Sequence, residues 1–323
     1  GGWTPNRYGG HENLEAIEFL RQLNAVAFGV NPNVLMIAEE STALPMVSRP
    51  ADVGGLGFNL KWNMGWMNDM CHYLKMDPWF RQDHHKDITF SMMYAFSENF
   101  VLPISHDEVV HMKGSVVGKM PGDYTNQLRC TRGFYAYLLA HPGKKLLFMG
   151  PELGQWHEWN SNGQLDWYLL DQPENQKIHQ FFKDANAFYK KTPALWEIDF
   201  SWEGFEWLVP DDNHNNVVVF LRKDKKGRDL LCAVNFSPNT YENYRVGVPD
   251  HRKYVPVFNT DDPAYGGDGF GDAVPVKVES IPSHGREHSA ALRIPAFGAV
   301  FLRGEGTFPK PRKKKQAKEL EKA

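Results

Sequence analysis

Three segments of the sequence run from apolar residues directly into acidic ones. They are LMIAEES at 35–41, LPISHDE at 102–108 and LLFMGPELG at 146–154. A short apolar run that ends abruptly in charge is typical of a buried parallel strand, whose carboxyl end is where side chains leave the core. The candidate active-site groups are the acids at these ends: Glu39 or Glu40, Asp107 or Glu108, and Glu152.

Paired carboxyl groups at strand ends are the groups needed to cleave a glycosidic bond. One must protonate the leaving oxygen, and another must act as nucleophile or stabilise the oxocarbenium-like charge. Tryptophans that lie near these ends in the sequence suit stacking on sugar rings, although burial in the core is the commoner role for any one of them. They are Trp62, Trp66, Trp156, Trp159 and Trp167.

The first part of the chain alternates strand and helix patterns, which predicts parallel βα units. Helices are expected at 11–28, capped by Asn13, and at about 64–76, 88–98 and 124–140. Strands are expected at 34–39, 58–63, 100–108 and 144–154. The carboxyl ends of such strands meet on one face of a (β/α)8 barrel, but closure needs eight strands and only about four precede the change of pattern.

The pattern changes near residues 191–195 to short, β-branched segments separated by turn residues. This is typical of an antiparallel β-sandwich. Its strands are expected within 217–223, 229–237, 244–249, 254–259, 276–282 and 291–303. We therefore divide the chain into a barrel portion at 1–192, an all-β domain at 193–305 and a charged, mobile tail at 306–323.

Composition excludes several classes of function. The formal charge of −3 on 323 residues creates no field that would favour nucleic acid or a membrane surface. No apolar run is long enough to cross a membrane, and residues 1–20 have no signal-peptide pattern. Three widely spaced cysteines, Cys71, Cys130 and Cys232, show no metal-ligand spacing, so we expect a cytoplasmic protein without metal or other cofactor.

Several longer motifs resemble one family. IAEES, GFNLKWNMGWMND, FVLPISHDEVVHMKGS, MPGD, AHPGKKLLFMG and QLDWYLLD together are similar to the bacterial 1,4-α-glucan (glycogen) branching enzymes of the α-amylase superfamily. The resemblance runs from residue 1 to about residue 304. It implies a glycosyltransferase acting on α-1,4-glucan, and a fold made of the C-terminal half of a (β/α)8 barrel followed by an antiparallel β-domain.

The resemblance also assigns roles to individual residues. The family's acid/base glutamate follows an Ile-Ala step at a strand end, which selects Glu39, and strand alternation independently prevents Glu40 from pointing the same way. In SHDE, Asp107 matches the transition-state stabiliser and His106 the donor to substrate hydroxyls. Trp62 and Glu152 are the remaining expected substrate contacts.

One catalytic group is not found. The family's nucleophilic aspartate would end a strand ahead of Gly1, and residues 1–30 contain no aspartate. We therefore expect the isolated chain to be inactive, with the N-terminal half of the barrel as its partner. An amylase-type hydrolase and a non-catalytic glucan-binding fragment stay open as alternatives, because both are compatible with the same residues.

Overall fold

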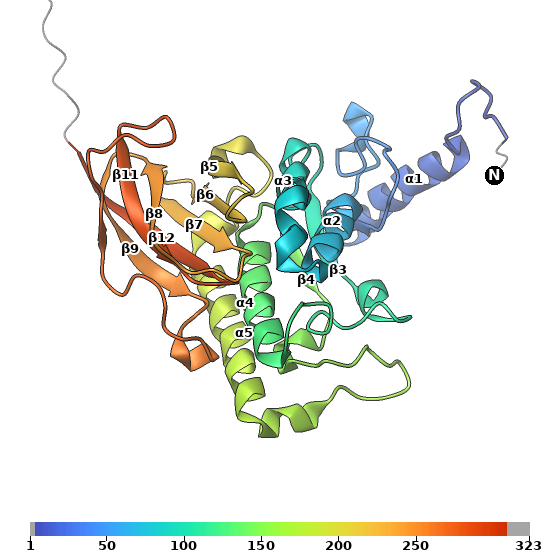
Figure 1. The fold of residues 1–323 in the computed structure, drawn as a ribbon. Coiled ribbons are helices and arrows are strands. Elements are labelled where there is room, and N and C mark those ends of the chain that lie inside the picture. The colour runs from blue at the N-terminus through green and yellow to red at the C-terminus, as the bar shows by residue number, and fades with distance from the viewer. Residues whose placement is uncertain (1–3, 309–323) are drawn as a thin grey trace, which may run out of the picture.

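The structure is a computed structural model that describes residues 4–308. Figure 1 shows two parts: helices around a small parallel sheet, coloured blue to green, and a group of antiparallel strands, coloured yellow to red. The parallel sheet has four strands in the order β1-β2-β3-β4. Their bounds are β1 (Ile37–Ala38), β2 (Leu60–Trp62), β3 (Phe100–Ile104) and β4 (Lys144–Leu147). This part confirms the expected incomplete barrel.

The α-helices of residues 4–308 are α1 (Leu14–Val30), α2 (Met64–Lys75), α3 (Lys86–Thr89), α4 (Tyr124–Ala140) and α5 (Pro173–Lys191). The Asn13 side chain accepts a hydrogen bond from the Ala16 backbone N–H and so caps α1, as expected. No helix in this range is long and apolar enough to span a membrane.

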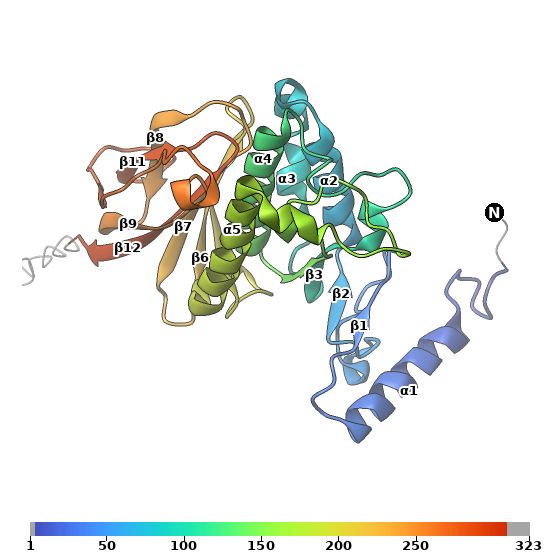
Figure 2. The same cartoon turned by 90° about the horizontal axis from the view of Figure 1, so that it is seen from below.

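Helix α1 projects away from α4 and α5 in both views (Figures 1 and 2). Its only buried residue is Asn24. Apolar side chains at helical spacing are exposed instead: Phe19, Leu23, Val26 and Val30. An amphipathic helix normally buries such a stripe, so this face of α1 lacks a partner within residues 4–308.

The second part is antiparallel. Its larger sheet has six strands in the order β10-β9-β12-β7-β6-β5, and β11 pairs with β8 in a second sheet. The bounds are β5 (Phe205–Asp212), β6 (Val217–Lys223), β7 (Asp229–Asn235), β8 (Tyr241–Val248), β9 (His251–Asn259), β10 (Val276–Lys277), β11 (His288–Ile294) and β12 (Ala299–Thr307). Side chains such as Leu221, Val246 and Leu292 meet between the sheets, as in a sandwich.

A single apolar core joins the two parts. It includes Phe134 of α4, Phe181 of α5 and Phe301 of β12, and it extends beneath β3 to Leu102. Helix α4 is buried on nearly all sides from Gln127 to Ala140 because it lies between the parallel sheet and the β-domain. The core therefore fixes the parallel sheet against the antiparallel one.

Several sequence predictions differ from the structure; among them, the strands expected at 100–108 and 144–154 end at Ile104 and Leu147, where 3-10 turns and loops follow. The expected strand at 34–39 is reduced to Ile37–Ala38, and Leu35 and Ile37 are exposed, because β1 is an edge strand with a neighbour on one side only. The expected helix at 88–98 is short: α3 ends at Thr89, a 3-10 turn follows at Phe90–Met93, and the chain then turns.

Strand β5 is absent from the predicted set, and β12 continues to Thr307, past the expected start of the tail. Residues 309–323 of that tail lie outside the described range.

A buried ion pair holds the junction between the two parts, and its removal is the first prediction. Arg222 of β6 donates to Asp199 Oδ1 over 2.7 Å and to the carbonyl oxygen of Ala140, the last residue of α4, over 2.6 Å. Both charged side chains are almost completely buried. Burial alone would raise the pKa of Asp199, but Arg222, Lys145 and Lys144 more than offset it, so the pKa is lowered.

We expect Arg222→Met to lower the free energy of unfolding by about 3–5 kcal/mol, because it leaves the Asp199 carboxylate buried with less compensation. Urea denaturation followed by circular dichroism measures this. The control is Arg303→Met, which removes a largely exposed pair with Glu305 and should cost less than about 1 kcal/mol. Equal costs for the two variants would contradict the expectation.

A second prediction concerns pH. His251 on β9 lies 2.8 Å from Asp229 Oδ2, and this hydrogen bond, partly opposed by burial, raises the histidine pKa above its ordinary value. A raised folded pKa contributes stability that is fully present below the unfolded pKa of about 6.5 and is lost as pH rises through the folded pKa. His251→Gln should therefore be less stable than the unmodified chain at pH 5.5 or so, with a difference that shrinks toward about pH 9. Exposed His214→Gln should show no such pH-dependent difference in melting temperature.

Candidate functional site

The candidate residues follow successive strands at one edge of the parallel sheet. Glu39 comes directly after β1, and Trp62 is the last residue of β2. His106 and Asp107 begin a 3-10 turn, η4 (His106–Val109), after β3, and Glu152 lies in η5 (Pro151–Leu153) after β4. Because all strand pairings are parallel, these carboxyl ends share one edge.

The adjacent glutamates differ in environment. Glu39 is exposed, whereas Glu40 is half-buried and its carboxylate accepts a hydrogen bond from the Thr42 backbone N–H. The loop behind Glu40 is held by Lys61, which donates to the Thr42 carbonyl oxygen over 3.1 Å. Glu40 therefore stabilises the turn that follows β1, whereas the side chain of Glu39 is exposed to solvent.

The turn that carries His106 and Asp107 is held by a reciprocal cap. The Glu108 carboxylate accepts from the Ser105 backbone N–H over 2.6 Å and from the Ser105 hydroxyl over 2.7 Å. Glu108 is buried by this arrangement, while about half of each side chain of His106 and Asp107 is exposed, at 49% and 54%. Of the two acids in SHDE, Asp107 is therefore the one available for chemistry.

The segment after this turn is anchored by two groups that the sequence analysis did not single out. Lys119 is buried and donates to the backbone carbonyls of Glu108 and Gly114. Burial lowers the pKa of Lys119 to about 8. Glu158 accepts from the backbone N–H groups of Gly114 and Met112, and these bonds lower its pKa.

The backbone between Glu108 and Gly114, which Lys119 and Glu158 hold, is strained. His111 and Met112 have φ of 56° and 63°, values that non-glycine residues rarely adopt. Residues held in such conformations persist where the surrounding contacts fix them, and they gather at functional sites. Neither Lys119 nor Glu158 had a sequence signal, because each acts on backbone atoms rather than through a side-chain motif.

The tryptophans divide between core and site. Trp66 is completely buried and belongs to the core, the alternative weighed from the sequence. Trp159 packs edge-on against His106, with ring centroids 5.9 Å apart, and against Phe148 at 5.0 Å. The exposed pair, Trp156 and Trp167, offers more than half of its surface to solvent. Trp159 therefore sets the orientation of the His106 ring.

Trp62 and Glu152 are the remaining residues predicted to contact a substrate. Trp62 is half-buried and lines a cavity of ≈ 500 Å³ formed with the loop 40–46. Glu152 is half-buried; its carboxylate accepts from the Gly150 backbone N–H over 2.8 Å, and its own carbonyl oxygen lies 3.1 Å from His179 Nδ1. Glu152 thus has an established structural contact on its own turn, which leaves only part of its carboxylate for a ligand.

One group of side chains has the residue types and spacing of possible metal ligands, which the sequence analysis did not single out. His72, His84 and Asp87 present ligand atoms that all lie within 4.8 Å of one another, away from the strand ends just described. The sequence does not show this group, because His72 is 12 positions from His84. The three cysteines are free thiols, and Cys71, although it directly precedes His72, does not belong to this group.

Comparison with known proteins adds independent information. The family model for the alpha amylase C-terminal all-beta domain matches residues 207–305. The 1,4-alpha-glucan branching enzyme GlgB of Aquifex aeolicus is 52% identical over 305 residues, which cover 94% of this chain and 48% of that protein. GlgB of Rubrobacter xylanophilus is 51% identical over 304 residues, covering 94% and 42%. The chain therefore spans about half the length, or less, of these curated relatives.

Solved structures share the fold at much lower identity. The alpha-amylase from H. orenii aligns over 94% of this chain and 59% of its own, with a TM-score of 0.57 and 16% identity. The debranching enzyme from Nostoc punctiforme aligns over 88% and 55%, with a TM-score of 0.59 and 15% identity. These likenesses support the architecture alone.

The Ser105–Glu108 cap yields the third prediction. Ser105→Ala removes one of two hydrogen bonds that Glu108 accepts, and we expect a cost of about 1 kcal/mol together with faster amide exchange at His106 and Asp107. Hydrogen exchange followed by mass spectrometry measures this locally. Ser97→Ala, which removes an exposed hydroxyl bonded to the Tyr94 carbonyl oxygen, is the control. Unchanged exchange at His106 and Asp107 in the Ser105 variant would show that the cap does not order the turn.

Proposed function

Because the chain belongs to the 1,4-alpha-glucan branching enzymes of the alpha-amylase superfamily, we propose that it carries part of a branching active site. The reaction cleaves an α-1,4-glucosidic bond, holds the segment as a covalent glycosyl-enzyme, and transfers it to a 6-hydroxyl to form an α-1,6 branch. The observation that carries the proposal is the exposure of Glu39 and Asp107 at the ends of β1 and β3, on one edge of the sheet.

The spacing of these strands suits two carboxyl groups around one sugar. Only β2 separates β1 from β3, so their axes are roughly 10 Å apart, and two acidic side chains reaching inward leave room for a sugar ring. Glu39 would protonate the leaving 4-oxygen and then take the proton of the incoming 6-hydroxyl. Asp107 would stabilise the positive charge of the transition state, and His106, oriented by Trp159, would donate to sugar hydroxyls.

Retention of configuration requires a nucleophile in addition to the roles proposed for Glu39 and Asp107. A retaining mechanism places a nucleophile about 5–5.5 Å from the acid/base carboxyl. We assign that role to an aspartate outside residues 1–323, on a strand that would pair with the free edge of β1. The exposed stripe on α1 and the exposed side chains of Leu35 and Ile37 are apolar surfaces on which the rest of such a barrel would pack.

Trp62 and Glu152 complete the proposed substrate contacts. Trp62 lines the cavity formed with the loop 40–46 and would stack on a sugar, and Glu152 would accept from a hydroxyl beyond β4. The division at residues 192 and 305, the cytoplasmic location and the absence of nucleic-acid and membrane partners stay predictions from the sequence.

The fourth prediction uses the adjacent glutamates as a matched pair. In the protein with the sequence that its gene encodes ahead of Gly1, Glu39→Gln should lower branching of amylose by about 10²–10⁴-fold, because general acid–base catalysis is lost. Glu40→Gln changes the same functional group one position away and should retain most activity. Branches are counted by chain-length analysis after enzymatic debranching.

The same assay separates the alternatives. Reducing ends released without new α-1,6 links would identify a hydrolase. Unchanged activity in Glu39→Gln would assign a non-catalytic, glucan-binding role to this part of the chain. Residues 1–323 alone should form no branches, and branching by that chain would show that the nucleophile lies within it.

A further inference from the structure

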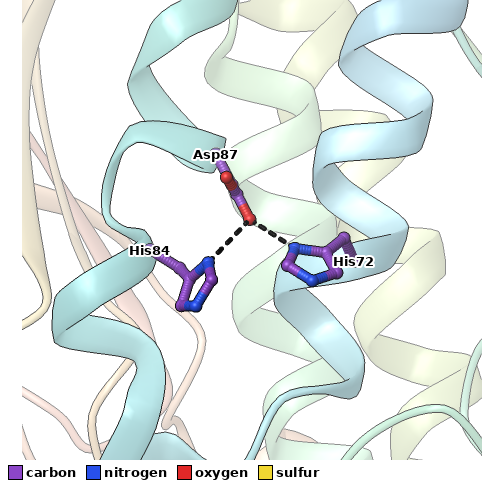
Figure 3. A group of neighbouring side chains, drawn as sticks. All are labelled: His72, His84 and Asp87. Atoms are coloured by element: carbon purple, nitrogen blue, oxygen red, sulfur yellow. Dashed lines mark hydrogen bonds and ion pairs between the residues drawn. The ribbon is translucent and has the colours of Figure 1, made fainter.

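A second group of side chains with its own chemistry lies on the helices rather than at the strand ends. His72 extends from α2, His84 from the 3-10 helix η2 (Pro78–His84), and Asp87 from α3, and all three point toward one another (Figure 3). Asp87 Oδ2 lies 2.7 Å from His72 Nδ1 and 4.0 Å from His84 Nδ1. The two imidazole rings meet edge to face, with centroids 5.2 Å apart.

The separations are close to those of a coordinated ion. Zn²⁺ binds imidazole nitrogen and carboxylate oxygen at about 2.0–2.2 Å, so tetrahedral ligands lie about 3.4 Å from one another. The observed distances of 2.7 and 4.0 Å bracket that value. Side-chain exposures of 59% for His72 and 44% for His84 leave both rings accessible to an ion from solvent.

The charges around the group favour a cation. Within residues 4–308 the ion pairs of the Asp87 carboxylate are with His72 and His84. Neutral imidazoles leave that negative charge uncompensated, whereas a dication would neutralise it.

We propose that His72, His84 and Asp87 form a binding site for a divalent transition-metal ion, of which Zn²⁺ is the representative, with water at the remaining position. Two nitrogen ligands and one oxygen ligand select such ions over Mg²⁺ and Ca²⁺, which take oxygen ligands. Each imidazole would coordinate through an unprotonated nitrogen and Asp87 through its ionised carboxylate, so affinity for the ion should fall at low pH.

The position of the site indicates a structural role. The segment that carries His84 and Asp87 also contacts the β-domain: Arg81 donates to the Phe236 carbonyl oxygen over 2.7 Å, and His85 Nε2 lies 2.9 Å from the Pro210 carbonyl oxygen. An ion bridging His72 to this segment would clamp α2 to the same piece of chain that touches β5. The site thus adds a link between the two parts of the fold and is separate from the proposed glucan chemistry.

The test is metal binding by the full chain, purified without a histidine tag, at about pH 7.5, where free imidazole is neutral. Isothermal titration with Zn²⁺ should give one equivalent, and a hundredfold excess over Kd should raise Tm by about 4 °C or more. Co²⁺ should give the intense visible bands of a tetrahedral site. Mg²⁺ and Ca²⁺ should neither bind nor shift Tm.

Matched variants locate the site. His84→Gln should weaken Zn²⁺ binding at least tenfold and abolish the shift in Tm, and Asp87→Asn should do the same. His157→Gln is the control, because His157 also pairs with an aspartate, Asp166, at 3.0 Å, but has no third ligand. One-equivalent binding that persists in His84→Gln, absence of Co²⁺ bands in the unmodified chain, or equal binding of Ca²⁺ would each overturn the proposal. The Co²⁺ spectrum of the unmodified chain decides even if a variant does not fold.

Discussion

The shared apolar core around α4 is the constraint on which the rest of the structure depends. Helix α4 contacts the β-domain so closely that a Cβ added at Gly133 would lie 2.3 Å from the Phe297 carbonyl oxygen. Glycine is needed there because only a residue without a side chain allows the two backbones to meet. The parallel sheet of four short strands is held against the antiparallel part by the apolar core that both share with α4.

This dependence divides the proposed site into a firmly held half and a loosely held half. The turn with Asp107 is fixed by Glu108, by buried Lys119 and by packing on the main core. The segment with Glu39 rests on a small separate cluster that includes Ala38, Val47 and Leu56. Strand β1 therefore contributes its glutamate from the least supported strand of the sheet, next to the α1 stripe that lacks a partner.

The sequence predicted best where burial follows from local pattern. Helix α4 at 124–140 and strand β6 at 217–223 agree with their expected bounds, because a buried helix and a central strand leave no other arrangement for their apolar residues. Local pattern did not predict how far an edge strand extends, or which residues distant in the sequence lie together in the fold. The strand at 34–39 shortens where one neighbour is missing, and the His72, His84 and Asp87 group depends on how a 3-10 turn folds back on α2.

A strand that would complete the proposed site would also cover the unpaired edge of β1. An edge strand with exposed apolar side chains, such as Ile37 on β1, invites pairing with another strand. In a closed barrel the partner of that edge is also the strand whose carboxyl end faces Glu39. Under the proposed function, a strand that paired with β1 would therefore also fix Glu39 and bring its own terminal side chain near that glutamate. The geometry of the proposed site and the closure of the barrel would thus be coupled at β1, whereas the turn with Asp107 is already ordered by contacts within this chain.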